Sequence, residues 1–489
     1  MVYPALLRSY VLSTGGTPVI LVVGYTHPGT GRSPPMPPRI VPILNRLRQD
    51  LASELTPDSI KAACKEEKYT WRKRLLDPVT TIYLFILQIL HGNTSCQHTT
   101  HFGEWNFTDS AYCAARKRLP LAVFQRLMRQ VADTFKKSIG SEADSKWRGH
   151  RVWLIDGSSF SMPDTPELQE AFGQPGNQKR GCGFPVAKFL ALFDLATGML
   201  LSVAPAPLRS HEMSRCAVAT AGMAPGDIAL GDRGFCSFAH LAILLNRKQH
   251  GVFRAHQRQI IDFTPGRPGG PGSKRKRPNA VIRPSSRWVR SQGDADQVVI
   301  LYKPKINPTW ISKEEYALLP DEITVRELRY IVHTPGYRVG EVTLVTTLLD
   351  ASEYPASELA DLYFRRWQVE VYFRDLKITL KMDVLRCETV DGVLKELAVF
   401  ALAYNLVRSV AGESAKIQGV APDRVSVIDT VRWLVGAEGD EDLSVILINP
   451  SRKGRTEPRV KKRRPKQYPL MTKPRAELRK ELLGENVAA

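Results

Sequence analysis

The spacing of hydrophobic residues along the chain changes near residue 150. Between residues 42 and 146 apolar residues recur every three or four positions, which predicts a series of amphipathic helices. One apolar stretch, at residues 82–90, is too short to cross a bilayer and predicts a buried helix. Residues 1–40 are rich in Pro and Gly, and we expect them to be disordered. The chain is therefore predicted to begin with a disordered segment followed by a helical domain.

Beyond residue 150 the pattern becomes that of β-strands joined by short turns. The segment VWLIDGSS predicts a buried strand that ends at Asp156, and DIALGDRGF predicts another that ends at Asp232. Between them, the segment AKFLALFDLATGMLLSVA predicts a β-hairpin with its turn at Ala196, Thr197 and Gly198. These strands alternate with an apolar helical pattern, which is typical of an α/β fold.

A β-rich insert and two helices follow. The basic loop GRPGGPGSKRKRP leads into strands of alternating polarity that extend to about residue 340. Pro355 and Ser357 mark the start of a long helix, and an apolar, Ala-rich helix is expected from Val393 to about Val410. We therefore expect a disordered segment (1–40), a helical domain (41–150), the first part of an α/β core (151–257), a β-rich insertion domain (258–340), the second part of the core with the long helix (341–445), and a basic tail (446–489).

Composition and charge narrow the class of partner. The chain has 489 residues and a net charge of +20, which favours a polyanionic partner, most often nucleic acid. The seven cysteines are irregularly spaced and give no disulfide framework, so we expect a reducing, cytoplasmic setting. No run of 18 apolar residues is present, and we expect no membrane partner.

Two basic clusters are candidate DNA contacts. One precedes a predicted helix in the N-terminal domain, and the other lies in the tail, where it is either a DNA-tracking arm or a solvated end. The charges of the first cluster could equally be solvated. The candidates are Arg116, Lys117 and Arg118 in the first cluster, and Lys461, Lys462, Arg463 and Arg464 in the second.

The segment YFRRWQVEVYFRDLK carries the most informative chemistry. Its Tyr363, Arg366, Glu370 and Lys377 stand at offsets 0, 3, 7 and 14. On a regular helix, at about 100° per residue, these offsets fall within an arc of roughly 60°. A carboxylate beside two cations suits a divalent metal that works next to phosphate oxygens. The alternative is a surface helix with ordinary ion pairs.

Three acids are candidate metal ligands. Asp156 and Asp232 each end an apolar strand, and Glu370 lies on the helical stripe. Carboxylate oxygens are the ligands that Mg²⁺ and Mn²⁺ prefer, and two such ions could drive an in-line phosphodiester displacement. An Asp near a strand end is also a common turn former, as we expect for Asp164 and Asp194.

The helical segment resembles a known family at this point. Its spacing Tyr-(2)-Arg-(3)-Glu-(6)-Lys is similar to the YREK signature of the type-4 branch of insertion-sequence transposases, which are DDE recombinases. The contexts LIDGSS and LGDRGF resemble the two catalytic Asp regions of that family. The interval of 138 positions from Asp232 to Glu370 resembles the family's habit of inserting a β-rich domain before the catalytic helix. The resemblance extends over roughly residues 42–480.

The resemblance implies a fold and a set of roles. The fold is a ribonuclease H-like α/β core, with a mixed sheet flanked by helices and interrupted by the β-rich insert. Asp156, Asp232 and Glu370 would hold Mg²⁺, or Mn²⁺ in its place, with two ions in all. Tyr363, Arg366 and Lys377 would hold phosphates of the element end.

The implied activity is metal-dependent cleavage and strand transfer by a homodimer at the terminal inverted repeats and at target DNA. The setting would be the bacterial cytoplasm, close to the nucleoid. In relatives a flipped base stacks on a Trp during hairpin formation. The matching position here is Val342, and Trp288 or Trp310 could substitute for it.

Alternatives remain open. A catalytically inactive DNA-binding derivative and a ribonuclease H-like nuclease without strand transfer are both compatible with the charge and the acids. The H-x4-C-x-H-x2-H cluster from His91 to His101 does not have an established zinc spacing. His211 and Glu212 follow the hairpin and could lie near the acids, although Glu212 would also suit a helix start.

Overall fold

The computed structural model describes most of the chain beyond residue 54. The described residues are 55–102, 106–139, 146–269, 286–332, 340–436, 442–450 and 471–483. The predictions for residues 1–40 and for the tail cluster Lys461–Arg464 lie outside these ranges.

The N-terminal part is helical, as predicted, and begins its helices at side-chain caps. Thr56, Asp77, Ser95 and Thr108 each accept a hydrogen bond from a backbone N–H in the first turn of a helix. The second of these helices is buried along nearly its whole length, which confirms the buried helix expected near residues 82–90. The helices are α2 (Pro57–Glu66), α3 (Pro78–Leu90), α4 (Cys96–Thr99), α5 (Asp109–Arg118) and α6 (Leu121–Ile139).

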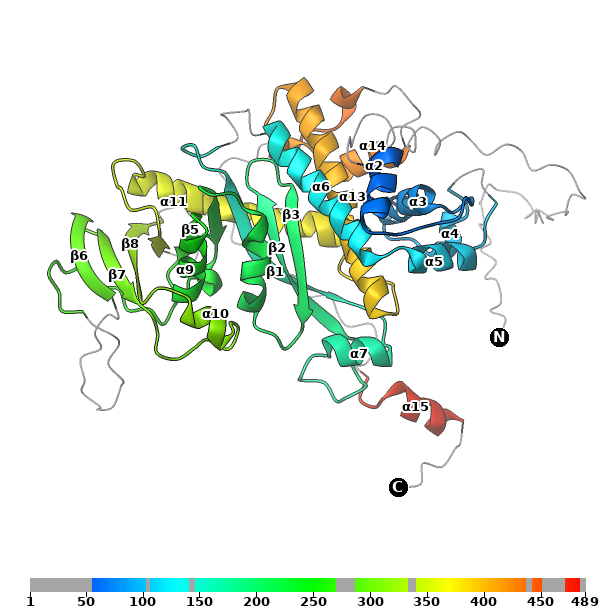
Figure 1. Ribbon diagram of the computed structural model, residues 1–489, viewed down its shortest axis with the longest axis horizontal. Coiled ribbons are helices and arrows are strands. Elements are labelled where there is room, and N and C mark those ends of the chain that lie inside the picture. Colours follow the sequence, from blue (N-terminus) through cyan, green and yellow to red (C-terminus); the bar gives the residue numbers. More distant parts are fainter. Residues whose placement is uncertain are drawn as a thin grey trace, which may run out of the picture. The chain divides into compact units, whose positions relative to one another are not determined.

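A nine-stranded mixed sheet forms the centre of the described chain (Figure 1). Its order is β3-β2-β1-β4-β5-β9-β8-β7-β6. Strands β1, β2 and β3 are antiparallel, whereas β4 and β5 run parallel to β1. The strands are β1 (Val152–Ser161), β2 (Val186–Asp194), β3 (Leu200–Pro207), β4 (Ile228–Gly231), β5 (His250–Arg254), β6 (Ser286–Gly293), β7 (Asp296–Tyr302), β8 (Glu322–Ile331) and β9 (Glu341–Thr346).

The predicted β-rich insert continues this sheet rather than forming a second one. Strand β9 pairs with β5 on one side, at Phe253 and Val345, and with β8 on the other. Strands β8, β7 and β6 then extend the sheet outward as an antiparallel meander. The described part of the insert is therefore joined to the core by backbone hydrogen bonds.

Helices cover both faces of the sheet. The long helix α13 (Val390–Gln418) joins α3 and α6 in one apolar cluster on the face of Leu154 and Phe160. Helices α8 (Cys216–Ala219) and α9 (Phe238–Asn246) contribute to a second cluster on the opposite face, with Trp153 and Ile155. Because adjacent residues of a strand point to opposite faces, β1 contributes to both clusters. Further α-helices are α7 (Pro166–Phe172), α10 (Lys313–Ala317), α14 (Val427–Gly436) and α15 (Arg475–Leu482).

The segment that carries the YREK spacing is helical, but its winding changes along its length. It runs as α11 (Ala356–Phe364), the 3-10 turn η6 (Arg365–Trp367), α12 (Gln368–Arg374) and the π-helix η7 (Asp375–Thr379). The 60° arc calculated for a regular helix therefore does not apply, because both irregular turns rotate the residues that follow them.

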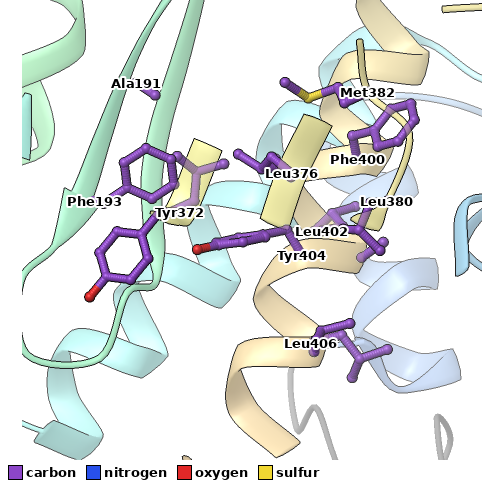
Figure 2. Close-up of a cluster of buried hydrophobic side chains, with 14 of the residues drawn as sticks. Ala191, Phe193, Tyr372, Leu376, Leu380, Met382, Phe400, Leu402, Tyr404 and Leu406 are labelled. Atoms are coloured by element: carbon purple, nitrogen blue, oxygen red, sulfur yellow. The ribbon is translucent and has the colours of Figure 1, made fainter. Parts of the chain in front are cut away.

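Aromatic packing fixes this helical segment to the sheet. Figure 2 shows Tyr372 and Leu376 beside Phe193 of β2 and Tyr404 of α13. The ring of Phe193 lies 5.5 Å from that of Tyr372 and 5.9 Å from that of Tyr404. Residues of α12 and η7 are thus held on the same face of the sheet as α13.

Strand β1 is longer than expected. Asp156 is the fifth of its ten residues, so the prediction that the strand ends there is wrong. Pairing with β2 continues to Ser161, while the parallel pairing with β4 stops at Ile155. Strand β4 ends at Gly231, so Asp232 is the first residue beyond the strand and not, as predicted from the sequence, its last residue.

Candidate active site

Two aspartates lie at neighbouring positions where the parallel part of the sheet ends. The last paired residues of β1 and β4 are Ile155 and Gly231, so Asp156 and Asp232 are the next residue on each strand path. Hydrogen bonds hold both carboxylates locally. Asp156 accepts one from the N–H of Gly157 at 2.8 Å, and Asp232 accepts one from the N–H of Gly234 at 2.7 Å.

Asp156 lies in an environment that opposes its negative charge. Burial is the main cause that raises its pKa to about 6, and the charges of Asp232 and Glu212 raise it further. The N–H of Gly157 and the guanidinium of Arg366 act in the opposite direction. A cation bound beside Asp156 and Asp232 would relieve this repulsion. Hard carboxylate oxygens also suit a divalent ion, so the donor chemistry fits Mg²⁺.

Tyr363 and Arg366, the first two residues of the YREK motif, interact electrostatically with these aspartates. Tyr363 is buried, which raises its pKa, while the charges of Arg366 and Arg254 lower it and that of Asp232 raises it. The guanidinium of Arg366 lies 5.8 Å from the Tyr363 ring and 4.7 Å from that of Trp367. Its Nε is buried and has no hydrogen-bond partner among the described residues. A donor of this kind is available for an anionic ligand.

The other two residues of the motif lie in different surroundings, because Glu370 faces solvent and Lys377 contacts strand β1. Glu370 is exposed on α12, and its side chain makes no hydrogen bond or ion pair with any residue of the described ranges. Lys377 lies in the π-helix, and its Nζ donates to Ser158 Oγ at 3.1 Å. Ser158 is two residues beyond Asp156 and points to the same face of β1. Lys377 therefore lies against the strand that carries the first aspartate.

The described acidic side chains do not by themselves form a cluster that could bind a metal ion. Within the part of the chain that the structure describes, no three acidic, imidazole or thiol side chains lie close enough together to share a metal ion. Asp156 and Asp232 interact electrostatically, and Glu370 is the third acid expected from the sequence. The assignment of these three residues as metal ligands stays a prediction.

The N-terminal basic cluster divides into an inward and an outward part. The guanidinium of Arg116 lies 3.7 Å from the Phe85 ring centroid and donates to Gln88 Oε1 at 3.2 Å and to Cys387 Sγ at 2.8 Å. It also lines a cavity of about 460 Å³ between the N-terminal helices and the start of α13. Lys117 and Arg118 are exposed, so they are the members of the cluster that could contact DNA directly.

Sequence reasoning missed one residue of the site and undervalued another. Arg254 ends β5 beside the end of β4, and its charge acts on Tyr363. The sequence showed only that Arg254 ends a short predicted strand, HGVFR. It did not show which strand lies beside that one, so the position of Arg254 near Tyr363 could not be predicted. Glu212 begins the 3-10 helix η3 (Glu212–Arg215), as expected for a helix start, and it also acts on Asp156.

Comparison with known proteins identifies the family. A family model described as "Transposase DDE domain" matches residues 147–406, more than half of the chain. The chain belongs to the family of DDE transposases. Within this family it is similar to the transposase InsG of insertion sequence element IS4 from Escherichia coli, with 26% identity over 384 residues. That alignment covers 74% of this chain and 78% of the relative.

Two further similarities are more limited. InsZ of Escherichia coli is 34% identical over 142 residues, which are 28% of this chain and 46% of that protein. The solved structure of a piggyBac transposase synaptic complex with hairpin DNA covers 81% of this chain and 79% of that chain. Its identity is 10% and its TM-score 0.39, a similarity too low to bear on the fold.

Family membership settles the class of activity. This DDE transposase of an insertion sequence is a polynucleotidyl transferase, and its family implies DNA binding and the use of a divalent metal. Among the described residues, no helix is both long and apolar enough to span a bilayer.

Proposed function

We propose that this transposase binds the terminal inverted repeats of its element, cuts the DNA at the element ends and joins the freed 3′-hydroxyls to target DNA. The observation that carries the proposal is the meeting of Asp156, Asp232, Tyr363 and Arg366, which come from β1, β4 and the YREK helix. Such a site combines acids for a hard cation with donors for phosphate.

A ribonuclease H-like core is the fold that we assign to the catalytic part. The strand order β3-β2-β1-β4-β5 supports it, with three antiparallel strands followed by two strands parallel to β1. The assignment treats β6, β7 and β8 as the inserted β-rich domain, and β9 (Glu341–Thr346), which pairs with β5, as the first strand of the second core part. The boundaries of 151–257, 258–340 and 341–445 are part of this proposal.

Each residue of the site has a proposed role. Asp156, Asp232 and Glu370 would hold two Mg²⁺ or Mn²⁺ ions, which supply activation of the attacking oxygen and charge neutralisation at the leaving oxygen. Arg366 offers its fork to a phosphate, Lys377 offers a point charge beside Ser158, and Tyr363 donates a neutral hydrogen bond. These contacts would place the scissile phosphate against β1.

DNA ends must be paired before transfer, so we propose that a homodimer acts in a synaptic complex close to the bacterial nucleoid. Lys117, Arg118 and the tail cluster Lys461–Arg464 would contact DNA away from the cleavage site. Arg116 would support this surface from inside, because its guanidinium is bound to Gln88 and Cys387.

Labelled element-end DNA tests the proposal directly. On a denaturing gel, Glu370→Gln should reduce Mg²⁺-dependent cleavage on the order of 100-fold or more, because several kcal/mol of charge stabilisation depend on the ligands. DNA binding should persist. The control Glu314→Gln changes an exposed glutamate of α10 and should leave cleavage intact. Equal cleavage by Glu370→Gln would refute the assigned role.

Product analysis separates transfer from simple hydrolysis. Joined DNA would identify a transposase that completes strand transfer, whereas cut DNA alone would indicate a nuclease, and binding without cleavage an inactive derivative. The hairpin step is a separate question, because a hairpin product needs a stacking partner for a flipped base. Val342 is buried in β9, but Trp310 lines a cavity of about 400 Å³ that also includes Gly234, two residues beyond Asp232. Loss of a hairpin band in Trp310→Ala would assign that step to Trp310.

A further inference from the structure

The loop between α2 and α3 combines exposed cations with aromatic rings. Residues 68–74 read KYTWRKR and lie outside any helix or strand. The four cations of this segment, all exposed, are Lys68, Arg72, Lys73 and Arg74. Among the described residues, none of their side chains forms an ion pair or a hydrogen bond. We call residues 67–77 the aromatic–basic loop.

The acids closest in sequence to these cations already have partners. Arg126 of α6 binds Glu66 and Glu67, with an N–O distance of 2.6 Å in each pair. Asp77 caps α3, because its carboxylate accepts a hydrogen bond from the N–H of Thr80 at 2.8 Å. The aromatic–basic loop therefore keeps an excess of positive charge, which favours an external anion.

Lys68 occupies a backbone position that ordinarily selects glycine. Its φ of 55° is left-handed, and it follows the end of α2 in a Schellman motif. In this motif the N–H of Tyr69 donates to the carbonyl of Cys64 at 2.8 Å, and the N–H of Lys68 donates to that of Lys65 at 2.9 Å. A side chain is strained in this conformation, so a lysine here costs stability. Such a cost is understandable if the ammonium group has a binding role.

The two aromatic rings of the loop form one wall of a small groove. The rings of Tyr69 and Trp71 are stacked, with centroids 6.2 Å apart and planes inclined by 19°, and both pack on the apolar core. The groove has a volume of about 190 Å³ and extends from these rings to the end of α5. Its charged lining residues are Arg72, Arg74, Asp77 and Arg118. It thus joins a predicted DNA contact, Arg118, to a segment that the sequence pattern did not single out.

Size and charge indicate what this groove can bind. Pockets for small molecules usually have volumes of about 300 Å³ or more, so a groove of about 190 Å³ is too small for a free nucleotide. Three guanidinium groups against one carboxylate favour an anion, and the guanidinium fork matches the oxygens of a phosphate. A DNA strand presents its phosphates singly, with a deoxyribose between them. One such phosphate suits the groove, and the exposed cations around it suit the phosphates on either side.

We propose that the aromatic–basic loop and Arg118 form a clamp for the sugar–phosphate backbone of duplex DNA at the element end. Arg72, Arg74 and Arg118 hold phosphate oxygens, and Lys68 contacts a neighbouring phosphate. The stacked ring pair lies against the adjoining deoxyribose. Backbone contacts orient a duplex but carry no base information, so the clamp positions the DNA and does not read its sequence. The inference rests on the proposed binding of element ends.

Two lysines in matching backbone positions give a controlled test. Lys248 is also exposed, has a φ of 57° and follows the end of α9, but it precedes β5 at the edge of the sheet opposite Asp232. Glycine relieves the same strain in both places, so neither Lys68→Gly nor Lys248→Gly should lower the thermal midpoint of unfolding. Lys68→Gly should nevertheless weaken DNA binding several-fold in fluorescence anisotropy, whereas Lys248→Gly should not. Equal losses in the two variants would contradict the clamp.

The salt dependence of binding tests the arginines of the full-length protein. Replacing Arg72 and Arg74 together by Gln should reduce the slope of log K against log salt by about 2, because each phosphate contact contributes roughly 0.9. Lys248→Gln should leave the slope unchanged. The loss of affinity should be equal for element-end DNA and for an unrelated duplex of the same length. A loss confined to element-end DNA would refute a backbone clamp, because the loop would then read bases.

The outcomes distinguish the clamp from the proposed function beneath it. If the loop variants bind DNA as the wild type does, while Lys377→Gln weakens binding, the clamp is refuted and the proposed site stands. The loop would then serve another anionic partner, such as an acidic protein. If the wild-type protein neither prefers nor cleaves element-end DNA, the proposed function itself fails.

Discussion

At the scale of single residues, the site combines a carboxyl that resists ionisation with cations held close to it. Burial raises the pKa of Asp156 to about 6, and Arg366 moderates the shift. The hydrophobic pattern placed Asp232 at the end of its strand, and the resemblance to DDE recombinases placed Tyr363 and Arg366 near the aspartates. The spacing could not show Arg254 or the approach of Glu212, because both depend on which strands are neighbours.

Asp156 should lower the stability of the metal-free protein at neutral pH. Its native pKa of about 6 exceeds the ordinary 3.8, so the native state binds more protons between these values and the free energy of unfolding falls as pH rises through this window. Asp156→Asn should therefore raise the free energy of unfolding by at most about 3 kcal/mol above pH 6 and by little near pH 4.

Urea unfolding in EDTA at pH 4.5 and pH 7.5 measures this difference. Asp164→Asn is the control, because Asp164 is exposed and accepts a hydrogen bond from Gln169. An Asp156→Asn protein that is no more stable than the wild type at pH 7.5 would contradict the prediction.

Ser158 should act on DNA through Lys377. Ser158→Ala removes the acceptor at 3.1 Å and frees the ammonium, at a cost of about 1 kcal/mol in the free energy of unfolding. We expect weaker binding of element-end DNA, by a few-fold, measured by fluorescence anisotropy. Ser159→Ala, on the opposite face of the same strand, should leave DNA affinity unchanged, and equal losses in both variants would exclude a specific effect.

At the scale of elements, strands and helices followed the hydrophobic pattern closely, whereas their irregularities did not. The hairpin of β2 and β3 and the strand β4 lie where alternation and turn residues placed them. Strand β1 is longer than predicted because β2 pairs with it as far as Ser161. This pairing depends on the neighbouring strand and not on the local sequence of β1. The π-helix η7 has no sequence signal in its spacing, yet it determines where Lys377 points.

The end of β4 should tolerate no added side chain. A Cβ at Gly231 would lie 2.8 Å from Ile155 Cγ2 and 3.0 Å from Phe235 Cδ2. Gly231→Ala should lower the free energy of unfolding by about 1 to 3 kcal/mol and displace the neighbouring Asp232. Cleavage of element-end DNA should fall with it.

A helical glycine provides the contrasting control. A Cβ at Gly412, inside α13, would meet no atom within 4 Å apart from its chain neighbours and the nearby backbone of its own helix, so Gly412→Ala should raise the free energy of unfolding by up to about 1 kcal/mol. Thermal unfolding compares the two variants. Equal stability of Gly231→Ala and the wild type would show that the β4 end can relax.

At the scale of the whole molecule, charge is the dominant property. With a net charge of +20, affinity for DNA should fall steeply as salt rises. The net charge alone predicts this salt dependence, and it also predicts that the partner is a polyanion such as nucleic acid. The path of the sheet from the core into the insert could not be predicted, because the pairing of β5 with β9 joins segments almost a hundred residues apart.

The tail cluster should contribute a measurable share of this salt dependence. Replacing Lys461, Lys462, Arg463 and Arg464 by Gln should reduce the slope of log K against log salt by about 3 to 4, if all four contact phosphates. Filter binding from 50 to 300 mM KCl measures the slope. A variant that exchanges Lys and Arg at the four positions keeps the charge and should keep the slope, and an unchanged slope after neutralisation would remove the tail from the interface.

The continuous sheet holds its outer strands at a fixed distance from the proposed catalytic residues on β1. Six strand spacings separate β1 from β6, which at about 4.8 Å each is a span of roughly 29 Å, or about eight base pairs of duplex at 3.4 Å. Backbone ladders make this span stiff, so any DNA contact on the outer strands stands at a set distance from the scissile bond. Relatives with more or fewer outer strands would change their footprint on the element end in whole-strand steps.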